Sequence, residues 1–565
     1  MLNSKMKADL IIKNASVVDV FGGDIVKGNV AIKGGRFLGI GDYSDATKTI
    51  DAEGKFISPT FTDSHVHIES SMISPKEFVK CLLSHGVSTI ICDPHEIANV
   101  CGLDGIRYIL DETANLPANV FVMLPSCVPA TEFETSGACL KASDYEDLIK
   151  NDRVLGLGEM MNYVGTVNRD PEILSKISLA SNLNKIIDGH APMLSGRDLD
   201  DYALAGISTD HEASTVLEMK ERISRGMYVA IRNGTAAKNL KTLLNGLNDI
   251  NFSRCFFCTD DSHPYDLVSK GSIDNMVNEA IAFGISPIKA IAMATINPML
   301  AYGIDGIGAI VPGYKADFFL FDSMNRINPE SVFISGNPVS LNGEFLPKFH
   351  SIPPKEVLSK MNVREILEED LKLLIPSGIA NVIKIEKDSL ITTKETCEVK
   401  TLNDEFLFSD NDILKICVID RHSGKSNISV GLIKGYGLKN GAIGTTVAHD
   451  SHNIIVVGDN DEDMLLVIKK IVSMSGGMAL SSKGSILGSL QLDIAGLMSS
   501  KPLETVSKTL NSLISKARSL GIPEGVDPFM TLSFMSLPVI PHLKITDKGL
   551  FDVDAFKMIP VDATK

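Results

Sequence analysis

The sequence predicts an α/β chain organised around a (β/α)8 TIM-type barrel, with a small composite β domain and a C-terminal α+β domain. Three observations support this prediction. Apolar strand-like runs alternate with helical stretches between about residues 60 and 265, β-branched runs precede them, and mixed strands and helices follow from about residue 380. With 565 residues, the chain has room for roughly two to four domains.

The first segment is rich in short β-branched runs punctuated by Gly and Asn, at residues 8–20, 28–41 and 48–60. The segment 308–322, GAIVPGYKADFFLFD, has the same composition. We therefore expect residues 1–58 and 306–355 to form one composite β domain, interrupted by a long excursion.

The excursion, residues 59–305, contains eight apolar runs, each followed by a polar or helical stretch. Eight such units fit a (β/α)8 barrel. An open doubly wound sheet would need a Gly-rich phosphate loop after the first strand, and His65–Ser74 contains no glycine. The runs are FTDSHVHI, VSTIICDPHE, NVFVMLPSCV, VLGLGEMMN, IDGHAP, GISTDHEA, MYVAIRNG and FFCTDDSHP.

Two helical runs follow, at 272–284 and 286–303. Residues 352–380 are charged and predicted to be helical, chiefly over KEVLSKMNVREILEEDLKLL (355–374), and they lead into the C-terminal domain, residues 356–565. That domain mixes strands such as DILKICVIDR with helices.

Composition narrows the possible partners. Net charge is 54 − 70 = −16, so phosphate backbones and anionic lipid surfaces are disfavoured. No apolar stretch approaches the roughly 18 residues of a membrane-spanning helix, and the N-terminus lacks the apolar core of a secretory signal. Nine thinly spread cysteines are typical of reduced thiols. We expect a cytoplasmic homo-oligomer acting on a small molecule.

Titratable residues end most of the eight runs, where a barrel places its active site. His65 and His67 alternate on the first run, so both imidazoles face one side. The other run ends carry these residues: Asp93, His95 and Glu96; Glu159; His190; His211 and Glu212; Asp260, Asp261 and His263.

Burying four imidazoles and two carboxylates without partners would be costly. Neutral imidazole and carboxylate are natural ligands of Zn, Mn or Fe(II). Six ligands exceed one tetrahedral ion and suit two ions about 3.5–4 Å apart. The predicted ligands are His65, His67, Glu159, His190, His211 and Asp260, with Glu159 placed to bridge. Asp261 could exchange roles with Asp260, because only one of two adjacent strand residues points inward.

These motifs resemble the amidohydrolase superfamily, and the flanking strings resemble the bacterial and archaeal adenine deaminases. The strings are Ser58–Met72, Asp93–Val100, Cys258–His263, His449–Asn453 and Gln491–Met498. The resemblance covers nearly the whole chain. One departure is Thr60, where the superfamily commonly has glycine.

The resemblance implies hydrolytic conversion of adenine to hypoxanthine and ammonia in purine salvage, at a binuclear centre of Mn(2+) or Fe(2+), with Zn(2+) possible. Many superfamily members bridge their metals with a carboxylated lysine on the fourth strand. Residues 154–161 contain no lysine, and Glu159 takes that position. The zinc signature of cytidine deaminases is excluded, because the pair Cys255 and Cys258 begins 188 residues after His67 and Arg254 replaces the required proline.

The expected mechanism is attack of a metal-bridging hydroxide on C6 of the purine. Asp260 would take the proton of the nucleophile and relay it to the amine. Either Glu96 or Glu212 could supply the ring proton, and the sequence does not choose between them. His95 and His263 are candidates for orienting the substrate, while Arg232 is expected to pair with an acid.

The C-terminal segment 447–453 concentrates two imidazoles, a carboxylate and an amide. We expect His449 and His452 to reach the active site and contact the base or hold an extra ion; the alternative is a polar turn between strands. A lid from this domain would exclude water from the barrel rim.

Two other functions compete with adenine deamination. A cyclic-amide hydrolase is disfavoured by the missing lysine on the fourth strand. A catalytically inactive, amidohydrolase-like binding protein is disfavoured because all six predicted ligands are present.

Overall fold

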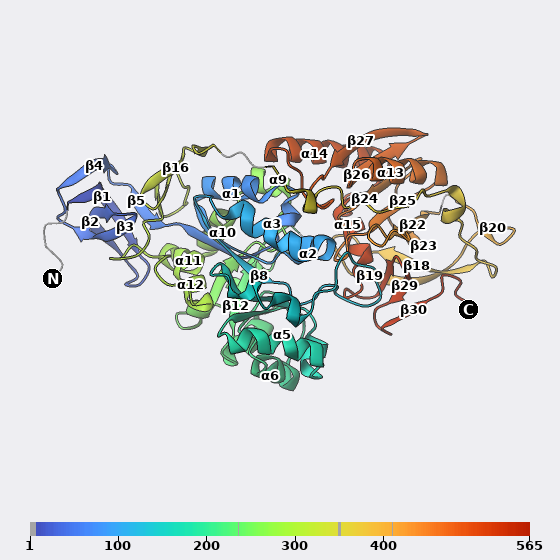
Figure 1. Cartoon of the computed structure of the whole chain (residues 1–565), viewed down its shortest axis with the longest axis horizontal. Helices are drawn as coiled ribbons and strands as arrows, with labels where there is room; N and C mark the ends of the chain where they lie inside the picture. Colours follow the sequence, from blue (N-terminus) through green and yellow to red (C-terminus); the bar gives the residue numbers. More distant parts are fainter. Residues whose placement is uncertain (1–6, 236, 349–351, 410) are drawn as a thin grey trace.

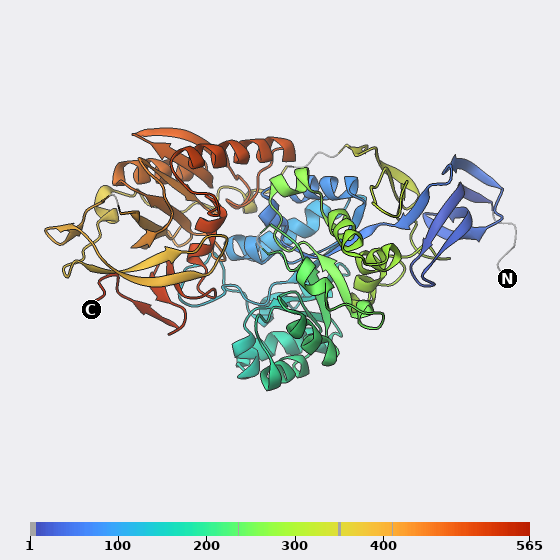
Figure 2. The same ribbon diagram turned by 180° about the vertical axis from the view of Figure 1, so that it is seen from behind.

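The computed structural model describes residues 7–235, 237–348, 352–409 and 411–565. Residues 1–6, which belong to the N-terminal stretch considered in the sequence analysis for a secretory signal, lie outside the described residues. An N-terminal sheet and a C-terminal domain lie at opposite ends of the molecule, with the barrel segment between them (Figures 1 and 2). Among the described residues, no helix has the length and apolarity that crossing a membrane requires.

The N-terminal sheet is built from two distant parts of the chain. Strand β5 (Phe56–Pro59) pairs in parallel with β1 (Ala8–Asp19) and antiparallel with β14 (Phe318–Phe321). Pairing of β14 with β5 thus returns the chain to the first sheet after the barrel segment. The remaining strands are β2 (Asp24–Lys33), β3 (Arg36–Gly41), β4 (Ala46–Asp51), β15 (Ser331–Ile334), β16 (Asn337–Leu341) and β17 (Glu344–Phe345).

The eight runs predicted as barrel strands all contain a strand, and the strands pair in parallel within two sheets. Hydrogen bonds between residues 65–67 and Asp260 join the first strand to the last, and an isolated bridge pairs Val66 with Asp260. One sheet comprises β6 (Phe61–Val66), β7 (Val87–Cys92), β8 (Asn119–Leu124), β9 (Val154–Met160) and β10 (Ile186–Gly189); the other comprises β11 (Thr209–Asp210), β12 (Tyr228–Arg232) and β13 (Cys255–Cys258).

The chain follows only in part the regular alternation of strands and helices that a complete (β/α)8 barrel has. Between β8 and β9 there are two short 3-10 helices, Ala142–Tyr145 and Leu148–Lys150, and no α-helix. Part of this connection binds the C-terminal domain instead, because the backbone N–H and hydroxyl of Thr135 donate to Asp547 at 2.8 and 2.6 Å.

The other strand connections contain α-helices. They are α1 (Pro75–Ser84), α2 (His95–Cys101), α3 (Leu103–Thr113), α4 (Tyr163–Val167), α5 (Pro171–Asn182), α6 (Gly196–Leu204), α7 (Val216–Ser224) and α8 (Leu240–Leu244), and α9 (Pro264–Ser269), α10 (Ile273–Phe283), α11 (Pro287–Ala294) and α12 (Ile296–Tyr302) follow the last strand.

The helix predicted over residues 355–374 is wrong. The segment forms only two short 3-10 turns, Lys355–Val357 and Glu368–Leu371. Val357 is buried and its carbonyl accepts from the N–H of Ala495 at 2.7 Å, whereas Leu367 and Leu374 are exposed. Tertiary contacts therefore override the helical propensity of this segment.

The C-terminal domain is a mixed sheet of eight strands with helices packed on it. In sheet order the strands are β19 (Thr392–Glu398), β18 (Ile379–Ile385), β23 (Ile428–Lys434), β22 (Ile413–Ile419), β25 (Ile454–Gly458), β24 (Gly441–Thr445), β26 (Gly477–Ser482) and β27 (Ser485–Gln491). Helices α13 (Asp461–Ser473), α14 (Leu503–Ser519) and α15 (Met530–Ser533) and strands β28 (Leu543–Thr546), β29 (Gly549–Asp552) and β30 (Lys557–Ile559) complete it, beside a small pair, β20 (Thr401–Leu402) and β21 (Glu405–Phe406).

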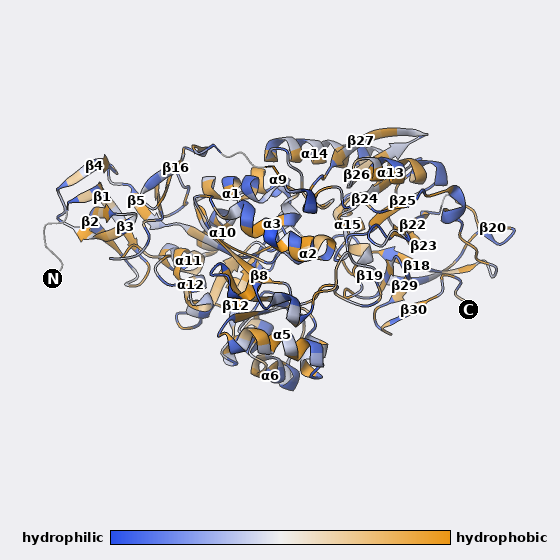
Figure 3. Cartoon of the chain, viewed as in Figure 1, coloured by the Kyte–Doolittle hydropathy of each residue, from blue (hydrophilic) through white to orange (hydrophobic). Residues whose placement is uncertain are grey.

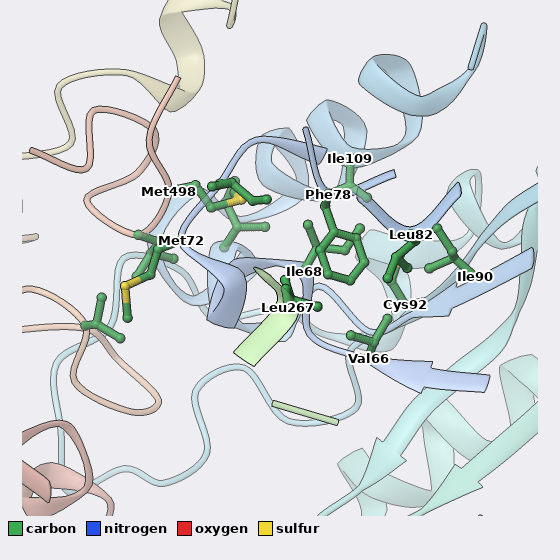
Figure 4. Close-up of a cluster of buried hydrophobic side chains, with 14 of the residues drawn as sticks. Val66, Ile68, Met72, Phe78, Leu82, Ile90, Cys92, Ile109, Leu267 and Met498 are labelled. Carbon is green, nitrogen blue, oxygen red and sulfur yellow. The ribbon is translucent and has the colours of Figure 1, made fainter. Parts of the chain in front are cut away.

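The barrel and the C-terminal domain share a continuous apolar core. Hydrophobic residues gather on the interior strands (Figure 3). Met72, which follows the first barrel strand, and Met498 of the C-terminal domain belong to one buried cluster with Phe78 and Ile68 (Figure 4). The N–H of Ser499 donates to the carbonyl of Met72 at 2.8 Å. This shared core fixes the C-terminal domain over the barrel rim.

A buried ion pair holds one part of that rim. Arg222 on α7 and Asp210 at the end of β11 are both fully buried, and Nε donates to Oδ2 at 2.5 Å. The guanidinium also donates to the carbonyls of Ala191 and Leu194. The pair therefore ties together the two segments that carry His190 and His211.

Replacing Arg222 with Leu should destabilise the chain strongly, because Asp210 would remain buried without its partner. We expect a loss of about 3–5 kcal/mol in the free energy of unfolding. The matched control is Arg225→Ala, which breaks a pair with the exposed Asp200 and should change the free energy of unfolding by less than about 1 kcal/mol. The chain has no tryptophan, so urea unfolding would be followed by far-UV circular dichroism. Equal effects of the two substitutions would contradict this account.

Candidate active site

The six predicted metal ligands converge at the carboxyl ends of the barrel strands. His65 lies on β6 and His67 directly after it, while Glu159 lies near the end of β9. His190, His211 and Asp260 follow β10, β11 and β13 within one or two residues. Five of the six are at most 5% exposed, and His190 is half-buried.

Glu159 is the centre of this cluster. Its Oε1 lies 3.3 Å from His67 Nε2 and 3.3 Å from His95 Nδ1. Its Oε2 lies 2.5 Å from His190 Nδ1 and 3.1 Å from His211 Nε2. Each carboxylate oxygen therefore faces a different pair of imidazoles, as a group between two cations would.

Asp260 and Asp261 point in different directions. Asp260 Oδ1 lies 3.4 Å from His65 Nε2 and 3.3 Å from His67 Nε2. Asp261 Oδ1 instead accepts from the hydroxyl of Ser70 at 2.5 Å. The backbone of Asp260 is left-handed, at φ +60°, and the side chains of Asp260 and Asp261 therefore point to different sides. Of the two aspartates, Asp260 is therefore the one placed among the imidazoles.

The backbone at Glu159 is held by a residue that the sequence analysis did not select as a site residue. Asp93 Oδ2 accepts the N–H of Glu159 at 2.9 Å. A Cβ atom at Gly158 would lie 1.9 Å from that same oxygen, so only glycine permits this approach. The carbonyl of Asp93 lies 2.9 Å from His67 Nδ1, which makes Nδ1 the donor, so that Nε2 is the free nitrogen of the neutral ring.

Unpartnered ring nitrogens indicate what the cluster binds. His65 Nε2, His95 Nδ1 and His211 Nε2 are buried and have no hydrogen-bond partner among the described residues. Orphaned buried nitrogens facing carboxylates are costly unless a cation binds them. Imidazole nitrogens and carboxylate oxygens are donors that fit divalent transition metals such as Mn, Fe or Zn.

The surrounding charges keep the carboxylates of Glu159 and Asp260 ionised. Burial alone would raise the pKa of Glu159, but His190 and His211 hold it well below its ordinary value. Burial likewise opposes ionisation of Asp260, and Arg232, His65 and His67 outweigh it, so its pKa is also well below the ordinary value. Burial and the nearby His65 lower the pKa of His211, which favours the neutral imidazole that a metal requires.

Arg232 at the end of β12 pairs with acids. Its Nη1 and Nη2 donate to the two oxygens of Glu212 at 2.5 and 2.8 Å, and Nη1 also donates to Asp260 Oδ2 at 3.0 Å. The Arg232 guanidinium therefore binds both Glu212 oxygens. Glu212 Oε1 also lies 3.5 Å from His190 Nδ1 and 3.6 Å from His211 Nε2. It lies at the edge of the cluster.

His95, predicted to contact substrate, lies inside the cluster. Its ring is 4.5 Å from that of His67, in an edge-to-face arrangement, and its Nε2 is 3.4 Å from Glu96 Oε1. His95 thus links the Glu159 cluster to a second group formed by Glu96, His449 and His452.

The C-terminal domain reaches the barrel rim through residues 449 and 452. His449 Nδ1 lies 2.6 Å from Glu96 Oε1, and His452 Nε2 contacts Glu96 Oε2. The His449 ring stacks on Phe534, with centroids 4.4 Å apart and planes inclined by 24°. Phe534 has no charge or spacing signal that sequence inspection could have used.

A narrow pocket lies where the two domains meet. Its walls include Ser70, Asp261 and His263 from the barrel and His449 and Phe534 from the C-terminal domain. His263, predicted to contact substrate, therefore lies at this pocket. A larger cavity of about 290 Å³ on the barrel flank, lined in part by Lys238, Lys241 and Lys270, contains none of the predicted site residues.

Comparison with known proteins places this geometry in a family. Residues 56–339 match the amidohydrolase family, and residues 389–557 match the adenine deaminase C-terminal domain. The adenine deaminase of Clostridium acetobutylicum is 48% identical over 98% of this chain and 97% of its own length. The chain belongs to the adenine deaminase family.

Other adenine deaminases agree over similar lengths. Adenine deaminase 2 of Carboxydothermus hydrogenoformans is 46% identical over 99% of this chain and 97% of its own. The adenine deaminase of Nitratidesulfovibrio vulgaris is 44% identical over 99% of this chain and 98% of its own. Both the barrel and the C-terminal domain of this chain are thus family features.

Substituting Glu159 with Gln should remove bound metal from this family member. The substitution keeps the shape but removes the charge that faces two pairs of imidazoles, so we expect metal content to fall by at least about tenfold. Bicarbonate should not restore it, since β9 carries no lysine to carboxylate. The control is Glu218→Gln, which alters a helix-capping carboxylate at α7. Elemental analysis after dialysis measures the effect, and wild-type metal content in Glu159→Gln would rule out the assignment.

Proposed function

We propose that this chain hydrolyses adenine to hypoxanthine and ammonia with divalent metal held around Glu159. One observation carries the proposal: the intact set of imidazoles and carboxylates stands at the rim of a chain that matches adenine deaminases over nearly its full length. A cyclic-amide hydrolase that relies on a carboxylated lysine has no counterpart here, since Glu159 occupies β9.

The proposed metal ligands are His65, His67, Glu159, His190, His211 and Asp260, with Glu159 between two ions. Their neutral nitrogens and carboxylate oxygens suit Mn(2+) or Fe(2+), and Zn(2+) remains compatible. When bound, such ions lower the pKa of water and stabilise negative charge that develops during hydrolysis. His95 is a further candidate donor, because its Nδ1 faces the same Glu159 oxygen as His67.

Asp260 is the proposed proton carrier. Arg232 engages Oδ2, so Oδ1 is the oxygen that faces the imidazole cluster. Its low pKa favours the carboxylate form, which can accept a proton from the attacking water and pass it to the amine that leaves C6. Arg232 thereby orients the group that moves the proton.

The adenine ring is proposed to occupy the pocket between the domains. The stacked rings of His449 and Phe534 form an aromatic wall for a planar base, and Ser70, Asp261 and His263 offer polar contacts around it. The C-terminal domain covers this side of the rim, which excludes bulk water from the reacting centre.

Adenine should be converted to hypoxanthine, whereas adenosine should not be converted to inosine. This expectation rests on the similarity to adenine deaminases over nearly the whole chain, and a closed pocket for a free base would leave no room for a ribose on N9. The manganese-loaded protein would be incubated with each compound, with products separated chromatographically and ammonia measured. A chelator-treated sample is the control. Turnover of adenosine at the rate of adenine would overturn the specificity, and absence of hypoxanthine would overturn the proposed function.

A further inference from the structure

Glu96 cannot itself reach a base in the pocket between the domains. It is 2% exposed and does not line that pocket. Both of its oxygens are engaged, Oε1 by His449 and His95 and Oε2 by His452. Glu212 has the same restriction, because Arg232 binds both of its oxygens. A different residue must therefore handle the proton of the purine ring.

Backbone hydrogen bonding fixes the protonation of His452. The N–H of Ala448 donates to His452 Nδ1 at 3.2 Å, so Nδ1 carries no proton. Burial lowers the pKa of His452 to about 4, which keeps the ring neutral. The single ring proton is then on Nε2, and Nε2 donates to Glu96 Oε2.

This tautomer argues against a third metal ion at Glu96. A metal-binding histidine normally donates a hydrogen bond from its other nitrogen. In His452 that other nitrogen is an acceptor, so binding through Nε2 would require an imidazolate. The backbone at His452 is also fixed by Arg421, which donates hydrogen bonds to the carbonyls of His452 and Ala495. The group of Glu96, His449 and His452 is therefore a hydrogen-bonded assembly.

His449 is the member of this assembly that faces the pocket. Its Nδ1 donates to Glu96 Oε1 at 2.6 Å, its ring stacks on Phe534, and it lines the pocket. Nε2 makes no hydrogen bond to the described residues. An imidazole is oriented for proton transfer when one of its nitrogens is hydrogen-bonded to a carboxylate and the other faces the substrate.

Resting on the proposed function, we propose that His449 is a catalytic residue contributed by the C-terminal domain. Its Nε2 hydrogen bonds to the purine and gives its proton to N1 as C6 becomes tetrahedral. Glu96 is a positioning residue that orients His449, and His452 in turn orients Glu96.

The protons balance in this scheme. The Nε2–H bond of His449 breaks as the N1–H bond forms, leaving a neutral imidazole, while Glu96 stays a carboxylate. One proton of the water travels through Asp260 to the departing ammonia. The second is released when the C6 carbonyl forms, and it restores the imidazolium.

The surroundings of His449 favour the charged form. Burial lowers the pKa of His449, but Glu96 outweighs it and the nearby carboxylates of Asp261 and Asp450 add to the effect, raising the pKa to about 9. His449 is therefore protonated at neutral pH and loses the proton only as the pH rises towards 9.

The test compares His449→Ala and His449→Gln with the wild type, measuring kcat, KM for adenine and metal content. The control is His542→Ala, which removes an exposed histidine that pairs with Asp554 on the same domain. We expect kcat to fall by about 10²–10⁴-fold in both His449 variants, with unchanged metal content. Gln can still donate a hydrogen bond, so KM should change little in His449→Gln. Added imidazole should partly restore kcat in His449→Ala and leave His542→Ala and the wild type unaffected.

Three results would overturn the inference. They are a folded His449→Gln with wild-type kcat, loss of metal from the His449 variants, and failure of imidazole to raise kcat of a folded His449→Ala. If His449→Ala does not fold, the kcat of His449→Gln decides. The wild type separates the two proposals: if it does not convert adenine, the proposed function fails, whereas an active wild type matched by His449→Gln contradicts only the role of His449.

Discussion

The active site depends on one buried carboxylate, that of Glu159. A charged group only 3% exposed is strongly destabilising unless positive charge or hydrogen-bond donors surround it. Here imidazoles from β6, α2 and the ends of β10 and β11 meet its two oxygens. Because those imidazoles come from separate strand ends and from α2, the charge of Glu159 and the arrangement of the barrel rim constrain each other.

The surrounding structure keeps that arrangement rigid. Asp93 holds the N–H of Glu159, and Tyr202 donates to the carbonyl of Met160 while accepting the N–H of His190. Arg232 connects Glu212 to Asp260 on the opposite side. The C-terminal domain adds a second charge centre at Glu96, anchored through the shared core around Met72 and Met498. Two carboxylates are thus each surrounded by imidazoles, one within the barrel and one across the domain boundary.

The barrel strands and most of the site residues could be predicted from the sequence, because an apolar run followed by titratable residues marks the end of a strand. Eight apolar runs predicted the positions of all eight barrel strands, and the six runs that end in His, Asp or Glu predicted the side chains that cluster at the rim. The choice between Asp260 and Asp261 could not be predicted, since it depends on a left-handed backbone at Asp260. The contact of Glu96 with His452 joins residues 356 positions apart, and no local pattern carries such information.

Two helices expected from the sequence are absent from the structure. The helix predicted over 355–374 is absent, because its buried apolar residues enter three separate apolar clusters: Val357 one, Ile366 and Leu371 a second, and Leu373 a third. The connection between β8 and β9 lacks the α-helix expected for a regular barrel, and part of it serves as a contact to Asp547. Both departures lie where the barrel and the C-terminal domain are joined.

The most direct test of the central role of Glu159 is anomalous X-ray diffraction from crystals of the manganese-loaded chain. We predict two anomalous peaks, each within bonding distance of one Glu159 oxygen, one beside His67 and the other beside His190 and His211. Peaks that avoid Glu159, or a peak only between Glu96 and His452, would contradict the account.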